Sequence, residues 1–169
     1  MIYTYGGDYG HYTVSDKNFN CNGLVSPDRV PNPHMYEAGK IQQPIWTTPV
    51  DLQKGAVEVY NENFFIDLSN YRMEWELVSE GVPVAQGVVN DLDIAPQQRK
   101  TITLGYTLPE GTGEVLLNVR YLLKQADGLL PAGTCLAYDQ LEVRPYSTFS
   151  AEACPAADSV RQVPSTKAL

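Results

Sequence analysis

The sequence is poor in basic residues and has no long apolar run. It holds 12 Lys and Arg residues against 20 Asp and Glu residues, which gives a formal net charge of −8 at pH 7. So few basic residues leave no patch to neutralise phosphates, which excludes nucleic acid as a partner. No apolar stretch approaches the roughly 18 residues that a transmembrane helix needs. Residues 1–8 also lack the positively charged and apolar regions of a signal peptide. From these two observations we expect no membrane partner.

Cysteine is also scarce. The three cysteines are an odd number at wide spacings, and neither a C-x-x-C pair nor a nearby pair of histidines accompanies them. This pattern excludes a disulfide framework and a zinc site. We expect Cys135 to be a small buried residue inside a strand, and Cys21 and Cys154 to be thiols in loops.

Motifs of catalysis are missing as well. His11 and His34 lie in irregular sequence, outside any metal-binding or nucleophile motif. Two carboxylate pairs occur, at Glu74 and Glu76 and within residues 91–93, and paired carboxylates can carry acid–base chemistry. We expect the first pair on the water-exposed face of a strand and the second in a turn. Spacing alone therefore predicts no catalytic residue.

The composition divides the chain into three parts. Residues 1–40 are rich in Gly, Asn, Asp, Tyr and Pro, and they sustain neither a helical nor a strand period. Residues 41–144 contain the runs of alternating apolar and polar residues that are typical of strands. Residues 145–169 are rich in Ser, Ala and Pro and are interpreted as a linker toward a following domain or as a tail. With 169 residues in all, this organisation predicts one domain with two attached arms.

The alternation predicts seven strands and no helix in the middle part. These strands cover residues 56–60, 64–66, 71–77, 82–89, 100–106, 114–124 and 134–143. A set of this size and spacing is typical of an all-β, immunoglobulin- or fibronectin-like antiparallel β-sandwich, here with an irregular N-terminal arm. We expect Trp75 and Tyr121, together with their same-face neighbours, to form the core.

Three segments of the arm carry a resemblance to a known family. Residues 5–10 (YGGDYG), 18–25 (NFNCNGLV) and 27–37 (PDRVPNPHMYE) closely resemble a motif of the large bacterial β-galactosidases of glycoside hydrolase family 2. In that family the motif follows the last strand of the TIM-barrel catalytic domain and leads into a fourth, immunoglobulin-like domain. The resemblance implies that residues 1–40 are the end of a barrel and residues 41–144 the fourth domain.

The resemblance also implies a site. Family members bind a sodium ion that ligates the galactose 6-hydroxyl, and their ligands include a main-chain oxygen and an Asn side-chain oxygen of this motif. Matched residue by residue, these positions are Phe19 and Asn22. Both are therefore expected to contribute to the metal and to the substrate. Sodium prefers such oxygen ligands. The resemblance also allows magnesium as a second metal of the full-length enzyme.

The same resemblance implies that the chain works as part of a larger enzyme. Retaining glycosidases need two carboxylates, and in this family both lie upstream of the motif, so we expect the chain alone to be inactive and Met1 not to be a natural start. Its expected partners are the remaining domains of a β-galactosidase, the β-galactoside substrate and further copies in a homo-oligomer. A cytoplasmic and a periplasmic location both stay open. A freestanding carbohydrate-binding module is the main alternative, and a complete small enzyme is a weaker one.

Overall fold

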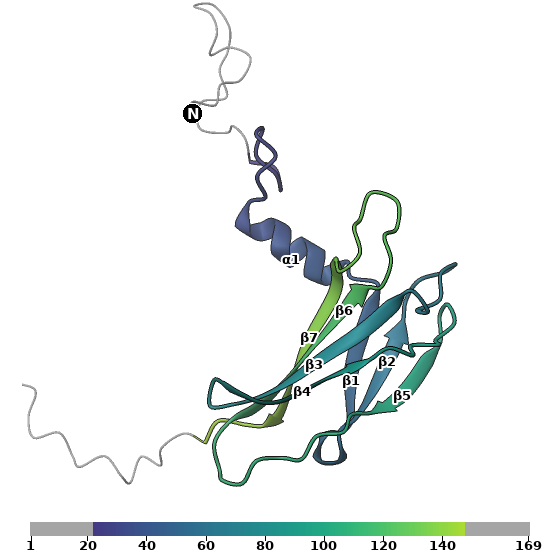
Figure 1. The fold of residues 1–169 in the computed structure, drawn as a ribbon. Helices are drawn as coiled ribbons and strands as arrows, with labels where there is room; N and C mark the ends of the chain where they lie inside the picture. The colour runs from purple at the N-terminus through teal and green to yellow at the C-terminus, as the bar shows by residue number, and fades with distance from the viewer. Residues whose placement is uncertain (1–21, 148–169) are drawn as a thin grey trace, which may run out of the picture.

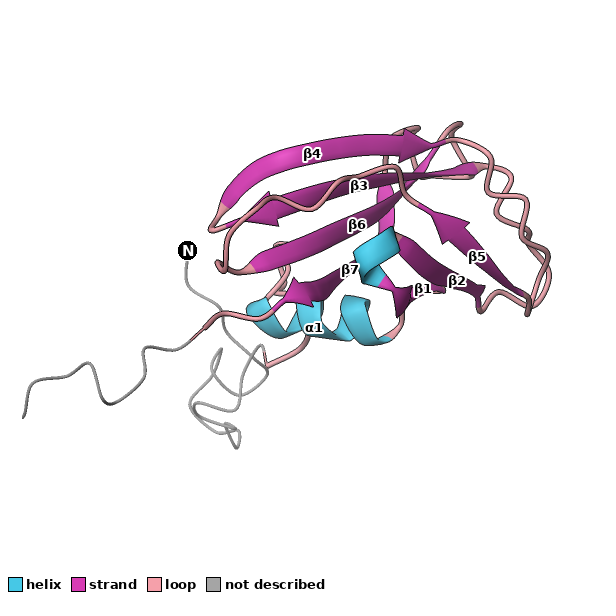
Figure 2. Cartoon of the chain, turned by 90° about the horizontal axis from the view of Figure 1, so that it is seen from below, coloured by secondary structure: helices cyan, strands magenta, loops and turns pink. Residues whose placement is uncertain are grey.

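The computed structural model describes residues 22–147, which form two antiparallel β-sheets packed face to face (Figures 1 and 2). One sheet has the strand order β1-β2-β5 and the other β4-β3-β6-β7. The strands are β1 (Ile45–Asp51), β2 (Ala56–Asn61), β3 (Tyr71–Ser79), β4 (Val82–Val89), β5 (Arg99–Thr103), β6 (Val115–Leu123) and β7 (Cys135–Arg144). A helix, α1 (Pro33–Ile41), precedes them, and a short 3-10 turn (Leu52–Lys54) joins β1 to β2. The expected all-β sandwich is confirmed.

The core lies between the sheets and follows the period-two pattern of the two central strands. On β3 and β6 the buried residues alternate with partly or fully exposed ones. The buried set is Tyr71, Met73, Trp75, Leu77, Val115, Leu117, Val119, Tyr121 and Leu123. Burying a large apolar side chain contributes about 1.5–3 kcal/mol, so this stripe supplies much of the stability of the sandwich. The expected core around Trp75 and Tyr121 is confirmed.

One hydrogen bond crosses the core between the sheets. The Tyr121 hydroxyl of β6 lies 2.6 Å from the Thr47 hydroxyl of β1, and the Tyr121 side chain is fully buried. Each group satisfies the other, as buried polar groups must. Burial raises the pKa of the Tyr121 hydroxyl far above its usual range, although the bond to Thr47 opposes the shift.

The prediction of a strand at residues 64–66 is wrong, because these residues form an exposed loop. Phe65 is 96% exposed, and β2 ends at Asn61, which is fully buried. The Asn61 amide donates to the carbonyl oxygens of Ile66 and Ile94 at 2.9 and 3.0 Å. This side chain therefore holds the loop by its backbone, and three apolar residues between turn residues are too few to extend a sheet.

The seventh strand is instead β1, which the sequence analysis missed. Pro49 interrupts its pattern, and a proline is tolerated in a sheet mainly at an edge. β1 is such an edge strand, with β2 as its only neighbour in the sheet. Only Ile45 and Thr47 are buried, so too few residues alternate to mark the strand.

Helix α1 is a second difference from the expectation. It begins where Asn32 is followed by Pro33, a pair typical of helix starts. None of its residues is buried, so the sequence carries no apolar stripe that reveals a helix. Among the described residues no helix is both long and apolar enough to cross a membrane.

The expected burial of Cys135 is also wrong. Cys135 opens β7 as expected, but its side chain is exposed. The β6–β7 register shifts between Tyr121 and Leu122, so that Tyr121 pairs with Ala137 and Leu122 with Cys135. Such a bulge breaks the strict alternation of inward and outward side chains along the strand. The Cys135 thiol therefore points away from the core and toward solvent. Cys21 and Cys154 lie outside the described residues.

The chain joins the sandwich at one end and leaves it at the other. α1 leads into β1 beside the hairpin between β6 and β7, whereas β7 runs to the opposite end (Figure 1). The two sheets meet where β7 approaches β1, because the Thr47 amide donates to the Asp139 carboxylate at 2.7 Å. This edge lies next to α1 and joins the arm to the sandwich.

Candidate functional site

The arm motif folds into a tight loop that its own backbone closes. Val25 and Pro31 form an isolated antiparallel bridge. Between them the Arg29 amide donates to the Ser26 carbonyl at 2.8 Å, with Pro27 and Asp28 at the central positions that these residue types favour in a β-turn. Arg29 has a φ of 66°, in the left-handed region. The Ser-Pro-Asp-Arg sequence therefore sets the shape of the loop.

Asn32 and His34 fasten the start of this loop to helix α1. The Asn32 amide nitrogen lies 2.7 Å from the Gly23 carbonyl oxygen, and His34 Nε2 lies 3.1 Å from the same oxygen. Because a carbonyl oxygen only accepts hydrogen bonds, Nε2 is the protonated nitrogen of His34. The Ser26 hydroxyl donates to the Asn32 side chain at 3.2 Å. His34, which matched no metal-binding or nucleophile motif, is thus a structural residue of the loop.

Only one of the two site residues expected from the resemblance lies within the described part of the chain. Phe19 lies outside the described residues. Asn22 is exposed, directly before Gly23, whose carbonyl oxygen is already used by Asn32 and His34. The Asn22 amide oxygen has the chemistry that a hard cation such as sodium prefers. Across residues 22–147 no group of three or more His, Cys, Asp or Glu side chains can hold a metal ion. The role of Asn22 as a sodium ligand therefore stays a prediction.

A second polar cluster joins α1 to the sandwich. Lys40, in the last turn of α1, reaches Asp139 of β7 with its Nζ 2.6 Å from Oδ1. Asp139 also accepts from the Thr47 amide at 2.7 Å and from the Gln43 side chain at 3.3 Å. The side-chain oxygen of Gln43 (Oε1) in turn accepts from the Tyr138 backbone amide at 3.1 Å. No sequence pattern predicts this cluster, because its members on either side of the contact lie almost 100 positions apart.

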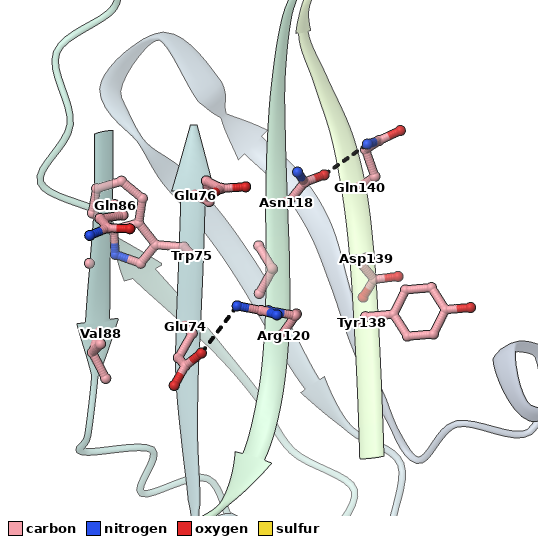
Figure 3. A pocket seen from close by; sticks show the side chains of 12 residues that line it. Glu74, Trp75, Glu76, Gln86, Val88, Asn118, Arg120, Tyr138, Asp139 and Gln140 are labelled. Atoms are coloured by element: carbon pink, nitrogen blue, oxygen red, sulfur yellow. Dashed lines mark hydrogen bonds and ion pairs between the residues drawn. The ribbon is translucent and has the colours of Figure 1, made fainter. Parts of the chain in front are cut away.

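The outer face of the four-stranded sheet forms an open groove of about 790 Å³ (Figure 3). Outward side chains cross the four strands in two rows, which are Val88, Glu74, Arg120 and Tyr138, and Gln86, Glu76, Asn118 and Gln140. Glu74 accepts from Arg72 at 3.0 Å and from Arg120 at 3.3 Å. Two guanidinium groups thus engage this carboxylate, and the expected structural role of the pair Glu74 and Glu76 agrees with their outward position.

Comparison with known families gives a match over residues 57–144, slightly more than half of the chain, to the model described as β-galactosidase, domain 4. The chain belongs to this family. The match covers β2 to β7, so the family is that of the sandwich rather than of the arm.

Curated relatives extend the similarity toward the arm. A β-galactosidase of Aeromonas hydrophila subsp. hydrophila is 43% identical over 108 residues, which are 64% of this chain and 10% of the relative. β-Galactosidase 2 of Enterobacter cloacae is 39% identical over 141 residues, 82% of this chain and 13% of the relative. A β-galactosidase of Actinobacillus pleuropneumoniae is 33% identical over 141 residues. The domain 4 family therefore includes this chain, which spans only about an eighth of the length of its relatives.

Proposed function

We propose that this chain is the non-catalytic part of a retaining β-galactosidase of glycoside hydrolase family 2 that follows the catalytic barrel. In this proposal residues 41–144 are an immunoglobulin-like scaffold and spacer, and the arm contributes Phe19 and Asn22 to the sodium and galactose site. The observation that carries the proposal is the domain 4 match over residues 57–144, together with relatives of which the chain spans 10% to 13%.

The positions at which the chain joins and leaves the sandwich support the spacer role. α1 and the start of β1 lie at one end, and β7 ends with Arg144 at the opposite end (Figure 1). A domain with this arrangement separates the segments before and after it by the length of its strands. Its strongly buried central strands make it a stiff spacer.

The arm supports the second role through Asn22. Its side chain is exposed, and it precedes a Gly23 carbonyl that two donors hold in place. Bound there, sodium would supply an electrostatic contact to a substrate hydroxyl. The residues of this chain would hold the ion from one side and orient the sugar, and the carboxylates that cleave the glycosidic bond would come from the barrel.

The proposal is tested in a chimera. The segment of the Enterobacter cloacae relative that corresponds to this chain is replaced by this chain, and hydrolysis of a chromogenic β-galactoside is measured. We expect the chimera to be active and the isolated chain to be inactive. Turnover by the isolated chain would refute the non-catalytic role, whereas a folded but inactive chimera would refute the proposed scaffold and site roles of this segment.

Substitution of Asn22 tests the arm in the same chimera. We expect Asn22→Ala to raise the sodium concentration for half-maximal activity about tenfold or more, because one oxygen ligand is lost. Asn90→Ala, at an exposed position after β4, is the control and leaves the sodium dependence unchanged. Equal sodium dependence in the Asn22→Ala and parent chimeras would remove Asn22 from the site.

The groove across β4, β3, β6 and β7 favours the alternative of a carbohydrate-binding module. It presents amide side chains and the half-exposed ring of Tyr138, groups that suit a sugar. Sugar platforms need stacked aromatic rings, however, and Tyr138 is the single aromatic side chain that points outward from the two rows. Retardation of the isolated chain on polysaccharide affinity gels, abolished in Tyr138→Ala, would favour this alternative.

A further inference from the structure

Helix α1 is held at both of its ends by hydrogen bonds from polar side chains. At the C-terminal end, Lys40 and the adjacent Gln43 bind Asp139 of β7. At the N-terminal end, Asn32 and His34 bind the Gly23 carbonyl. The nine residues of α1, at about 1.5 Å each, give the helix a length of roughly 13 Å between the sandwich and the loop that holds Gly23.

We propose that α1 is a strut that fixes Asn22 relative to the sandwich, with Lys40 and Asp139 as its positioning residues. The proposal rests on the proposed role of Asn22 and extends it, because it makes the sandwich part of the device that orients the sodium and galactose loop. A continuous path of hydrogen bonds supports it, from Asp139 through Lys40 and the backbone of α1 to His34 and Gly23.

The C-terminal contact has the properties of a specific anchor. The Asp139 side chain is only 10% exposed and accepts from groups of three separate segments, α1, the linker after it and β1. Removal of a partner leaves such a carboxylate with a desolvation penalty that nothing compensates. Lys40 Nζ also donates to the Tyr138 carbonyl and lies 5.3 and 4.9 Å from the ring centroids of Trp46 and Tyr138. These rings add cation–π attraction and restrict the ammonium to one place.

The anchor matters because, among the described residues, α1 contributes no buried side chain that would dock it on the sandwich. None of its residues is buried in the core, so apolar packing does not restore its position when the polar contacts are lost. A reacting group or ligand displaced by about 1 Å can lower a rate on the order of 100-fold. Loss of the anchor therefore leaves the sandwich folded and impairs the site through Asn22.

Hydrogen exchange of the isolated chain tests the anchor directly. We expect Lys40→Met and Asp139→Asn to accelerate amide exchange in α1 about tenfold or more, while β6 keeps its protection. The matched control is Lys54→Met, which removes the Lys54–Asp51 ion pair (2.9 Å) beside the 3-10 turn. Lys40→Arg retains a charged donor and restores slow exchange. Unchanged exchange of α1 in Lys40→Met and Asp139→Asn would overturn the strut.

The chimera with the Enterobacter cloacae relative tests the consequence. We expect Lys40→Met to raise both KM and the sodium concentration for half-maximal activity about tenfold, and Lys40→Arg to restore both values. Lys54→Met leaves both unchanged. If Asn22→Ala changes sodium dependence and Lys40→Met does not, the strut is refuted and the Asn22 site stands. If neither does, the proposed site itself fails.

Discussion

In the sandwich, the inward residues of β3 and β6 are buried, whereas helix α1 buries none of its nine residues. The first region is held by apolar area removed from water and the second by a few hydrogen bonds and one ion pair at its ends. Apolar burial is spread over many contacts and tolerates the loss of any one polar group. The arm instead depends on single atoms, so its position can be changed without unfolding the domain.

A matched pair of tyrosines gives the largest expected contrast between the two regions. Tyr121 in β6 is fully buried and Tyr36 in α1 is 66% exposed. We expect Tyr121→Ala to lower the free energy of unfolding by about 3–5 kcal/mol, because it leaves a cavity and an unpaired Thr47 hydroxyl. Tyr36→Ala should change it by less than about 0.5 kcal/mol. Urea denaturation measures both, and similar losses would contradict the contrast.

The same contrast explains what the sequence revealed. β3 and β6 were predicted because Tyr71, Met73, Trp75 and Leu77, and the matching residues of β6, alternate strictly. β1 was missed because its pattern ends at Thr47 and a proline follows. Cys135 was misplaced because a bulge reverses its face, and a bulge leaves no mark in the alternation.

The site was less accessible to sequence reasoning than the sandwich. Asn22 and Phe19 came from a resemblance and not from any periodic pattern. The contact of Lys40 with Asp139 joins residues that only the completed fold brings together, and no local signal predicts it. Asn32 followed by Pro33, and Lys40 in the last turn, are the local signs of α1, and an exposed helix adds no apolar stripe to them.

A glycine of the sandwich should be the next most sensitive position. A Cβ atom at Gly87 of β4 would lie 2.6 Å from the nearest atom of the Trp75 indole ring. We expect Gly87→Ala to destabilise the domain by about 1–3 kcal/mol, because Trp75 must move within a packed core. Gly105→Ala, where nothing lies within 4 Å of the added Cβ, is the control. Equal urea midpoints for the two variants would show that the core next to Trp75 is loosely packed.

Alkaline pH should lower the stability of the sandwich through the buried hydroxyl of Tyr121. Desolvation raises the pKa of Tyr121 above its ordinary value, so above a pH of about 10 the unfolded chain loses this proton before the folded one. Stability from this group is complete below pH 10 and falls above it by about 1.4 kcal/mol per pH unit. Tyr121→Phe should remove this share of the slope in urea titrations between pH 9 and 11. An unchanged slope in Tyr121→Phe would show that the buried hydroxyl does not carry this effect.

The smallest expected effect is a gain of stability confined to the arm. Gly39 lies inside α1 with nothing within 4 Å of an added Cβ, so alanine fits there and favours the helix by up to about 1 kcal/mol. Because α1 contributes no buried residue to the core, this gain should slow amide exchange in α1 about fivefold and leave the urea midpoint of the sandwich unchanged. A rise of the midpoint would mean that α1 and the sandwich unfold as one unit. The helix would then belong to the cooperative domain, and its two polar ends would be insufficient to explain how it is held.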